Sequence, residues 1–237
     1  MGMGIKSALK RRITFLMAPK RALGLWKGEF VETYQEWRTK RLIAILEHYG
    51  LHFFEGKTVL EVGAGFGDIG GFISEMGAKV VCTEGRATNL AAIRRRFKDR
   101  MVIHRLDLNR PDAITKNFDV IIHLGVLYHL QDYMKPLQNA CAHCQHLILE
   151  TEVADSDDPN FVLKVKESFE GYDQALDGLG CRPSAAAVEK VLTECGMAFE
   201  RITDSRCNGG FHYYDWPVTN SGLWKGGQRR FWFAHKI

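Results

Sequence analysis

The stretch from Thr58 to Gly71, TVLEVGAGFGDIGG, constrains the fold more than any other part of the chain. An apolar run interrupted by one acid, Glu61, ends at three glycines spaced two residues apart, Gly63, Gly65 and Gly67. A residue without a Cβ can take positive φ and lets a ligand lie against bare backbone. The pattern therefore predicts a buried strand, a tight turn that can bind a ligand, and then a helix.

The glycine-rich turn fits two kinds of nucleotide cofactor. A dinucleotide site requires G-x-G-x-x-G directly after the strand, but in the register that begins at Gly63 the sixth position is Asp68. The register that begins at Gly65 matches the motif, yet it begins two residues too late. Glu84 supplies the acid expected about 20 residues further on for either cofactor. The glycines and this acid therefore do not distinguish between the two kinds of cofactor.

Apolar runs typical of strands alternate with helical patterns from residue 57 onward. This alternation predicts an α/β fold with a parallel sheet and helices on both faces. We expect strands at 58–62, 79–84, 101–106, 118–124 and 146–152, and helices at 67–76, 87–97, 111–116 and 133–143. Ligands bind beyond the carboxyl ends of such strands. The residues at those ends are Glu61, Gly63, Glu84, Asp107, Leu124 and Glu150.

The second half of the chain is less regular. An acidic stretch after residue 153 leads into a run that we interpret as helical up to Leu176. Ser184 is a natural N-cap and Gly196 a natural stop, which predicts a helix between them. Two further strands are expected at 199–205 and 230–235.

An aromatic segment, residues 207–228, separates these last two strands. It is longer than usual connections, and its glycines make it a candidate lid. We therefore divide the chain into an N-terminal helical cap, residues 1–52, and a ligand-binding domain, residues 53–237, that carries this aromatic loop as an insertion.

The N-terminal cap contains two predicted helices. Residues 5–17 form a basic amphipathic helix, and residues 30–49 form a second helix. The first helix packs on its own domain or docks on a partner, and both interpretations remain open. Three aromatic residues are either core residues or walls of a ligand site: Trp26, Tyr34 and Trp37.

Charge and hydropathy exclude several classes of function. The net charge is +4, but residues 1–41 carry ten Lys or Arg and three acids, so the rest of the chain is slightly acidic. A nucleic-acid contact would therefore come through the N-terminal arm. No apolar run is long enough to span a membrane, and no signal peptide is recognisable, which favours a cytoplasmic location.

Six cysteines in a chain of this size predict reduced thiols rather than a disulfide framework. Cys141 and Cys144, with His143 and His146 beside them, have the spacing of half a zinc site. No second ligand pair stands at a matching spacing. We therefore predict no metal ion.

Four motifs occur in order along the first two thirds of the chain. E-x-G-x-G-x-G begins at Glu61, Glu84 ends KVVCTE, Asp107 lies in MVIHRLDL, and FDVIIHLGVLYHL follows. Together they resemble class I S-adenosylmethionine-dependent methyltransferases over residues 56–153. The resemblance implies a Rossmann-like, mostly parallel sheet of seven strands with an antiparallel last strand, and S-adenosyl-L-methionine as the cofactor.

The resemblance also implies which residues bind the cofactor. The glycine turn would approach the methionine moiety and the ribose through its backbone, Glu84 would accept hydrogen bonds from the ribose hydroxyls, and Asp107 with Leu108 would bind the adenine edge. Glu61 would hold the loop or the amino group, and Arg86 would pair with an acid or border the adenosine. The implied set is Glu61, Gly63, Ala64, Gly65, Gly67, Glu84, Gly85, Arg86, Asp107, Leu108 and Leu124.

Candidates for the acceptor side follow the fourth and fifth strands. His129 follows the fourth strand, and an imidazole suits a general base near neutral pH. The alternative is a structural histidine that caps the following helix. Glu150 or Glu152 after the fifth strand and His212 or Asp215 in the aromatic loop are further catalytic candidates. The substrate-binding candidates are Tyr128, Arg182, Tyr214 and Trp216.

A narrower similarity concerns GVLYHL and the later GYDQALDGLGCRPSAAAVEKVL. These segments resemble the methyltransferase domain of wobble-uridine tRNA-modifying enzymes that use a carboxylated cofactor, and Arg182 could meet such an anion. The sizeable N-terminal domain of those enzymes has no counterpart here. We therefore expect a methyltransferase that acts on an O or N atom of a small molecule. A tRNA-modifying methyl or carboxymethyl transferase is the second hypothesis, and a non-catalytic cofactor-binding protein of the same fold is the third.

Overall fold

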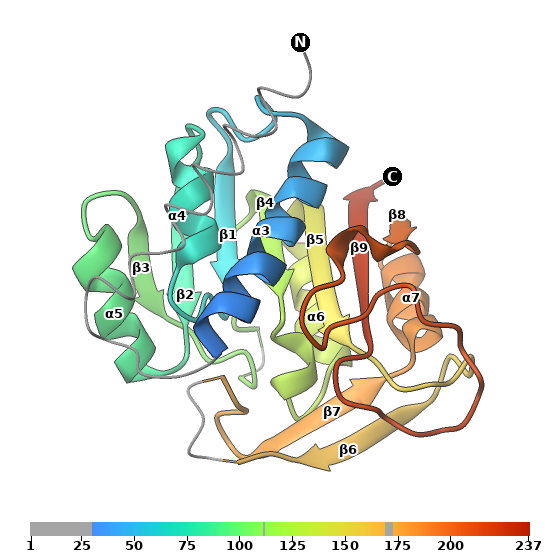
Figure 1. Cartoon of the computed structure of the whole chain (residues 1–237). Helices are drawn as coiled ribbons and strands as arrows, with labels where there is room; N and C mark the ends of the chain where they lie inside the picture. Colours follow the sequence, from blue (N-terminus) through green and yellow to red (C-terminus); the bar gives the residue numbers. More distant parts are fainter. Residues whose placement is uncertain (1–29, 111, 169–172) are drawn as a thin grey trace.

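The computed structural model describes residues 30–110, 112–168 and 173–237 (Figure 1). The predicted helix at 5–17 and Trp26 lie outside the described residues. For Tyr34, only the backbone is described. The predicted helix at 30–49 is confirmed as α3 (Phe30–Tyr49).

Within the described residues, seven strands form one sheet in the order β3-β2-β1-β4-β5-β9-β8. Neighbouring strands are parallel except where β9 pairs with β5 on one side and with β8 on the other. The prediction of a mostly parallel seven-stranded sheet with an antiparallel last strand is therefore confirmed. The strands are β1 (Thr58–Val62), β2 (Lys79–Glu84), β3 (Val102–Arg105), β4 (Phe118–Leu124), β5 (Cys144–Glu152), β8 (Met197–Ile202) and β9 (Arg229–Lys236).

Helices cover both faces of this sheet, as predicted (Figure 1). Successive strand residues point to opposite faces, so Val59 packs with α3, α4 and α5, whereas Leu60 packs with α6 and α7. Trp37 and Ile45 of α3 belong to the same core as the sheet, although α3 falls in the predicted cap. The other helices are α4 (Asp68–Glu75), α5 (Ala87–Phe97), α6 (Met134–Ala142) and α7 (Ala185–Glu194).

The predicted start and end of α7 are confirmed. The Ser184 hydroxyl accepts a hydrogen bond from the Ala187 N–H at 2.9 Å, which satisfies one of the free donors of the first turn. Gly196 follows the helix with a φ of +69°, a conformation that suits glycine.

The helix predicted at 111–116 is wrong, because residues 112–117 form a loop. Asn139 of α6 replaces the hydrogen bonds that a helix would have made. Its side chain accepts from the Ile114 N–H at 2.8 Å and donates to the Ile114 carbonyl at 3.0 Å. The buried Ile114 side chain is thereby fixed against α6 in an extended segment.

The helical interpretation of the run up to Leu176 is also wrong. β6 (Val162–Lys166) and β7 (Leu179–Pro183) form a two-stranded antiparallel sheet instead. A partner strand supplied by the tertiary structure overrides local propensity here. This β6–β7 hairpin lies across the lower end of the main sheet in Figure 1.

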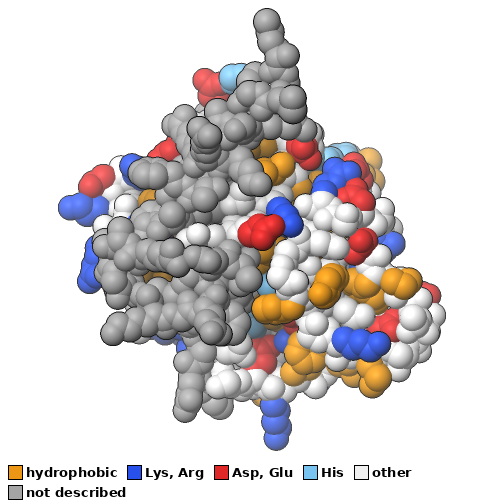
Figure 2. Space-filling view, in the orientation of Figure 1, with side chains coloured by type: hydrophobic (Ala, Val, Ile, Leu, Met, Phe, Trp, Pro, Cys, Tyr) orange, Lys and Arg blue, Asp and Glu red, His pale blue; other side chains and the backbone are white. Residues whose placement is uncertain are grey.

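The aromatic loop is attached to the body by a buried acid. It follows β8 and the short 3₁₀ helix η2 (Ser205–Cys207) and ends at β9. Asp155 accepts hydrogen bonds from the N–H and hydroxyl of Thr219 and from the Ser221 hydroxyl. Phe211, Tyr213 and Leu223 of this loop remain exposed. Figure 2 shows apolar side chains gathered at the lower right of the view.

Candidate active site

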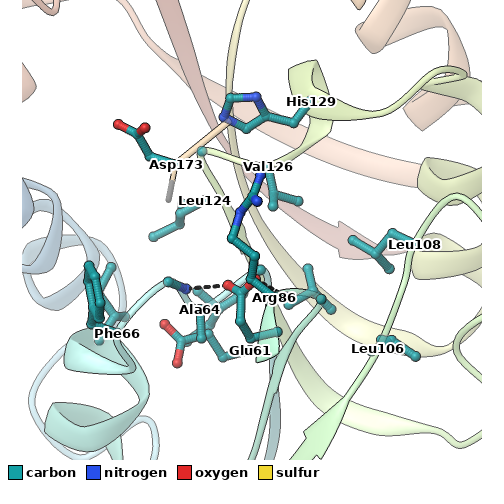
Figure 3. A pocket seen from close by; sticks show the side chains of 18 of the residues that line it. Glu61, Ala64, Phe66, Arg86, Leu106, Leu108, Leu124, Val126, His129 and Asp173 are labelled. Carbon is teal, nitrogen blue, oxygen red and sulfur yellow. Dashed lines mark hydrogen bonds between the residues drawn. The ribbon is translucent and has the colours of Figure 1, made fainter. Parts of the chain in front are cut away.

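One pocket lies at the carboxyl ends of β1, β2 and β4, where the sheet predicts a ligand site. Figure 3 shows Glu61 and Ala64 at one end of this pocket, His129 and Asp173 at the other, and Leu106 and Leu108 along one side. Predicted site residues that line it are Glu61, Gly63, Ala64, Gly65, Glu84, Gly85, Arg86, Leu108, Leu124, Tyr128 and His129. Predicted residues outside its lining are Gly67, Asp107, Glu150, Arg182, His212, Tyr214 and Trp216.

The glycine turn has the backbone that its sequence predicts. Gly63, Gly65 and Gly67 have φ values of +57°, +59° and +73°. A Cβ at Gly63 would overlap the Val126 side chain, whereas a Cβ at Gly65 would meet no heavy atom within 4 Å. Gly65 thus leaves bare backbone facing open space, as a bound nucleoside requires. Gly67 instead sets the start of α4 as its N-cap.

Glu84 ends β2 and faces this turn. Its Oε2 accepts a hydrogen bond from the Gly65 N–H at 2.8 Å, and its Oε1 accepts from the Arg86 N–H at 2.9 Å. Burial raises the pKa of Glu84, although these backbone donors act in the opposite direction. A carboxylate offers about four lone-pair positions, so Glu84 can also accept from a hydroxyl donor of a ligand.

Glu61 holds the first turn of α4 against β1. Its Oε2 accepts from the Gly70 N–H at 3.0 Å and lies 3.5 Å from the Cys82 sulfur. Burial raises the pKa of Glu61 to about 8. A Cβ at Gly70 would overlap this carboxylate, so the glycine is required for the contact.

Asp107 shapes the neighbouring turn. Its Oδ1 accepts a hydrogen bond from the Asn109 N–H at 3.0 Å. Leu106, Leu108 and Asn109 line the pocket around it. Asn109 and Leu106 were not among the predicted site residues, although their place beside Asp107 in the sequence could have indicated them.

His129 lies in η1 (Leu127–His129), directly after β4. Its Nδ1 is 2.5 Å from Oε2 of Glu167, which follows β6. The alternative of a histidine that caps the next helix is wrong, because α6 has Tyr133 as its N-cap and no side-chain cap hydrogen bond. Glu167 was missed because its segment was interpreted as helix.

Glu150 lies in a fully buried ion cluster. Its Oε1 accepts from Arg229 Nη1 at 2.7 Å and from the Tyr214 hydroxyl at 3.2 Å. Its Oε2 accepts from Arg41 Nη1 at 3.1 Å. Arg41 itself lines the pocket, and its guanidinium stacks 3.7 Å from the Trp37 ring centroid. The cluster therefore lies directly behind the side of the pocket that Trp37 and Arg41 form.

The ion cluster continues through Glu152 and Arg182. Arg229 Nη2 lies 2.9 Å from the Tyr128 hydroxyl and 3.4 Å from Glu152 Oε1. Arg182 Nε donates to Glu152 Oε2 at 2.8 Å, and its Nη1 donates to Glu167 Oε1 at 3.0 Å. Arg182 is thus occupied by carboxylates of the protein itself.

The aromatic loop packs its central part on α3. The His212 ring stacks on Trp37 with centroids 3.9 Å apart, and the Trp37 indole N–H donates to the Tyr214 hydroxyl at 2.7 Å. Burial, with the Arg229 and Arg41 charges, lowers the pKa of His212 to about 2. Trp216 donates to the Arg229 carbonyl at 3.3 Å. Trp37 lines the pocket, whereas His212, Tyr214 and Trp216 do not.

Two other kinds of feature are absent from the described part of the chain. No three His, Cys, Asp or Glu side chains there converge as metal ligands. No helix in the same residues is long and apolar enough to cross a membrane.

The fold and the pocket define a nucleotide-binding protein of the Rossmann-like α/β class. A family model described as a methyltransferase domain matches residues 34–201, which is most of the chain. The chain belongs to this family, the class I S-adenosylmethionine-dependent methyltransferases, and S-adenosylmethionine is its cofactor. The family resemblance predicted from the four motifs is confirmed.

Solved structures share this fold at low sequence identity. The N-terminal domain of EvdMO1, determined in the presence of SAH and D-fucose, is 16% identical with a TM-score of 0.65, and the match covers 98% of this chain and 97% of that one. Magnesium protoporphyrin IX methyltransferase from Synechocystis PCC 6803 with bound SAH is 14% identical with a TM-score of 0.59, over 94% and 99% of the two chains. A putative RNA methyltransferase from Pyrococcus horikoshii is 16% identical with a TM-score of 0.53, over 86% and 84%. No curated protein matches the sequence.

Proposed function

We propose that this enzyme transfers the methyl group of S-adenosylmethionine to an O or N atom of a small molecule. The observation that carries the proposal is that one and the same pocket is lined by Gly65 and Glu84 at one end and by His129 at the other. Two neighbours of the same fold support a small acceptor by their names, one studied with D-fucose and one acting on magnesium protoporphyrin IX. We also propose a cytoplasmic location, which the six free thiols support.

S-adenosylmethionine supplies an activated methyl group when it is bound. In this proposal the Gly63 to Gly67 turn receives the methionine moiety and the ribose on its backbone, and Glu84 accepts hydrogen bonds from the ribose hydroxyls. Leu106 and Leu108 border the adenine, while Asp107 fixes the turn that carries them. The open space at Gly65 and the remaining lone pairs of Glu84 support these roles.

On the acceptor side, we propose His129 as the catalytic residue, with Tyr128 and Trp37 as walls. All three line the pocket. The complete burial of Glu150 and the stacking of His212 on Trp37 support structural roles for these two, as parts of the wall behind the acceptor. Burial supports the same role for Arg182 and Tyr214, and the hydrogen bond of Trp216 to the Arg229 carbonyl supports it for Trp216.

The first experiment is incubation with methyl-labelled S-adenosylmethionine and a source-cell extract that has been split into RNA and low-molecular-weight fractions. We expect label in the low-molecular-weight fraction. Glu84→Ala serves as the control without bound cofactor and should transfer nothing. Label confined to RNA would contradict the proposal.

A tRNA-modifying enzyme is the second candidate. It is favoured by the segment from Gly171 to Leu192, which resembles wobble-uridine enzymes, and by the basic residues before position 41. If RNA is the substrate, affinity should fall steeply as salt rises, because phosphate neutralisation releases counterions. A transfer rate that does not change with salt would speak against RNA.

A further inference from the structure

The β6–β7 hairpin brings an acid to the acceptor end of the pocket. Glu167 follows β6 directly, and its N–H donates to the Gly178 carbonyl at 2.9 Å, which extends the hairpin by one residue. A Cβ at Gly180 of β7 would overlap both the Glu167 side chain and the Tyr128 carbonyl. Glycine at this position therefore lets the hairpin lie directly against the segment that carries His129.

Both carboxylate oxygens of Glu167 are bound by donors. Oε2 lies 2.5 Å from His129 Nδ1 and accepts from the Ala175 N–H at 2.8 Å, while Oε1 accepts from Arg182 at 3.0 Å. The side chains of His129 and Glu167 are 13% and 4% exposed. Burial by itself raises the pKa of Glu167, but His129, Arg182 and the Ala175 N–H lower it overall. The carboxylate that faces the imidazole is thus ionised near neutral pH.

We propose that Glu167 positions His129 as the base that takes the proton of a hydroxyl acceptor, an inference that rests on the proposed function. An ionised carboxylate can only accept hydrogen bonds, so whenever the imidazole carries one proton, that proton is held on Nδ1. Nε2 is then the proton acceptor. His129 lines the same pocket as Glu84. Its imidazole lies at the end of the pocket opposite Glu61 and Ala64, where the acceptor would bind (Figure 3).

The transfer balances with the groups present. The acceptor oxygen forms a bond to the methyl carbon while the carbon–sulfur bond breaks, and the sulfur keeps the electron pair and becomes neutral. The hydroxyl proton passes to His129 Nε2. The resulting imidazolium is stabilised by the Glu167 carboxylate, which stays ionised because Arg182 faces its other oxygen.

A base of this kind favours a hydroxyl over an amine. An alkylammonium loses its proton to water before transfer, and the neutral amine then carries a nucleophilic lone pair that needs no base in the transition state. A hydroxyl is a weak nucleophile until a positioned base takes its proton in the transition state. The pairing of His129 with a buried carboxylate therefore favours O-methylation over N-methylation.

The first test needs no acceptor. Histidine nitrogen spectra of the full-length protein should show His129 with its proton on Nδ1, and Glu167→Gln should weaken this preference. Glu189→Gln is the matched control, because Glu189 also pairs with an arginine but lies on α7. A proton on Nε2 of His129 in the wild-type protein would overturn the positioning role of Glu167.

The second test is kinetic and uses the low-molecular-weight extract fraction at saturating S-adenosylmethionine. Glu167→Gln should lower the transfer rate by about 10²-fold, the lower range for general-base catalysis, with unchanged cofactor affinity by calorimetry. Added imidazole should restore part of the activity of His129→Ala. The double variant should be no slower than His129→Ala, because the two residues act as one unit. A Glu167→Gln rate equal to that of Glu189→Gln would overturn the proposal.

The identity of the methylated product tests the hydroxyl acceptor separately from the proposed function. A methyl NMR signal typical of an O-methyl group supports the hydroxyl acceptor, and an N-methyl signal overturns it while leaving the proposed function standing. If the wild-type enzyme labels no small molecule, the proposed function fails and the acceptor class fails with it, whereas the spectra still decide whether Glu167 positions His129.

Discussion

Positively and negatively charged side chains alternate along the buried ion cluster between α3, β5, β7 and β9. Removing an ion from water costs several kcal/mol, and the cost is offset only when each ion meets a counter-charge and further hydrogen bonds. Every carboxylate of this cluster accepts from an arginine at 3.4 Å or less. The members, in order of contact, are Arg41, Glu150, Arg229, Glu152, Arg182 and Glu167.

Glu150→Gln should destabilise the protein strongly. The change removes the negative charge that faces both Arg41 and Arg229 in a fully buried site. Breaking a buried pair costs about 3–5 kcal/mol, and urea unfolding measures this loss. Glu200→Gln, at a side chain that is 69% exposed, is the control. An equal effect of both variants would show that the buried cluster does not carry this energy.

Glu61 should make stability fall as pH rises. The pKa of Glu61 is raised from 4.5 to about 8 in the folded protein, mainly by burial. Between these values the folded state holds a proton that the unfolded state has lost, so the free energy of unfolding decreases with pH and levels off above pH 8. Glu61→Gln cannot ionise, so its stability relative to wild type should grow across this window in urea unfolding. A constant difference across the window would refute the assignment.

Some site residues could be predicted from the sequence because their requirements are local. Gly63 and Gly65 meet a backbone need for positive φ, and Glu84 ends a strand that periodicity identifies. Arg41 and Glu167 could not be predicted, since their partners Glu150 and His129 are 109 and 38 positions away in the chain. Such contacts depend on packing that no local pattern encodes.

At the scale of elements, the aromatic loop and the β6–β7 hairpin depart most from expectation. The sequence marks residues 207–228 as unusual, but the packing of His212 and Tyr214 on Trp37 makes them part of the body. The helical interpretation before Leu176 failed because strand β6 obtains its backbone hydrogen bonds from β7. Both elements are defined by distant partners.

Asp155→Ala should loosen the aromatic loop. Asp155 accepts from Thr219 N at 2.6 Å, Thr219 Oγ1 at 2.5 Å and Ser221 Oγ at 2.7 Å, and these donors would lose their partner. We expect faster proteolytic cleavage within 207–228 and a loss of about 1–3 kcal/mol. Cofactor affinity should not change, because the loop does not line the pocket. Asp99→Ala, at an exposed acid between α5 and β3, is the control, and equal cleavage in both variants would refute the anchor.

At the scale of the whole molecule, the C-terminal strand β9 completes the sheet and core that the preceding elements begin. β9 inserts between β5 and β8 and buries Phe231, Trp232 and Phe233 on the two faces of the sheet. The pocket likewise joins Trp37 of α3 with strand ends of β1, β2 and β4 and with Gln174. Cofactor binding should therefore report on the whole fold.

Saturating S-adenosylmethionine should raise the melting temperature. A ligand at 100 times its Kd adds about 2.7 kcal/mol of stability, which corresponds to a shift of about 5–10 °C for a chain of this size. Scanning calorimetry with and without cofactor measures it. Glu84→Ala should lose the shift, whereas Glu55→Gln, at an exposed acid, should keep it. A full shift in Glu84→Ala would remove Glu84 from the cofactor site.

The sequence by itself determined the parallel α/β sheet, the glycine turn and the methyltransferase family. The sheet and the turn follow from residue periodicity and from the φ values that a short motif demands, and both act within a few neighbouring positions. The family follows from the resemblance that four motifs carry. Only the tertiary structure decided that Glu150 meets Arg41 and Arg229, that Arg182 meets Glu152 and Glu167, and that Glu167 faces His129. A buried charge is stable only beside its counter-charge, and the fold brings the two together from distant parts of the chain.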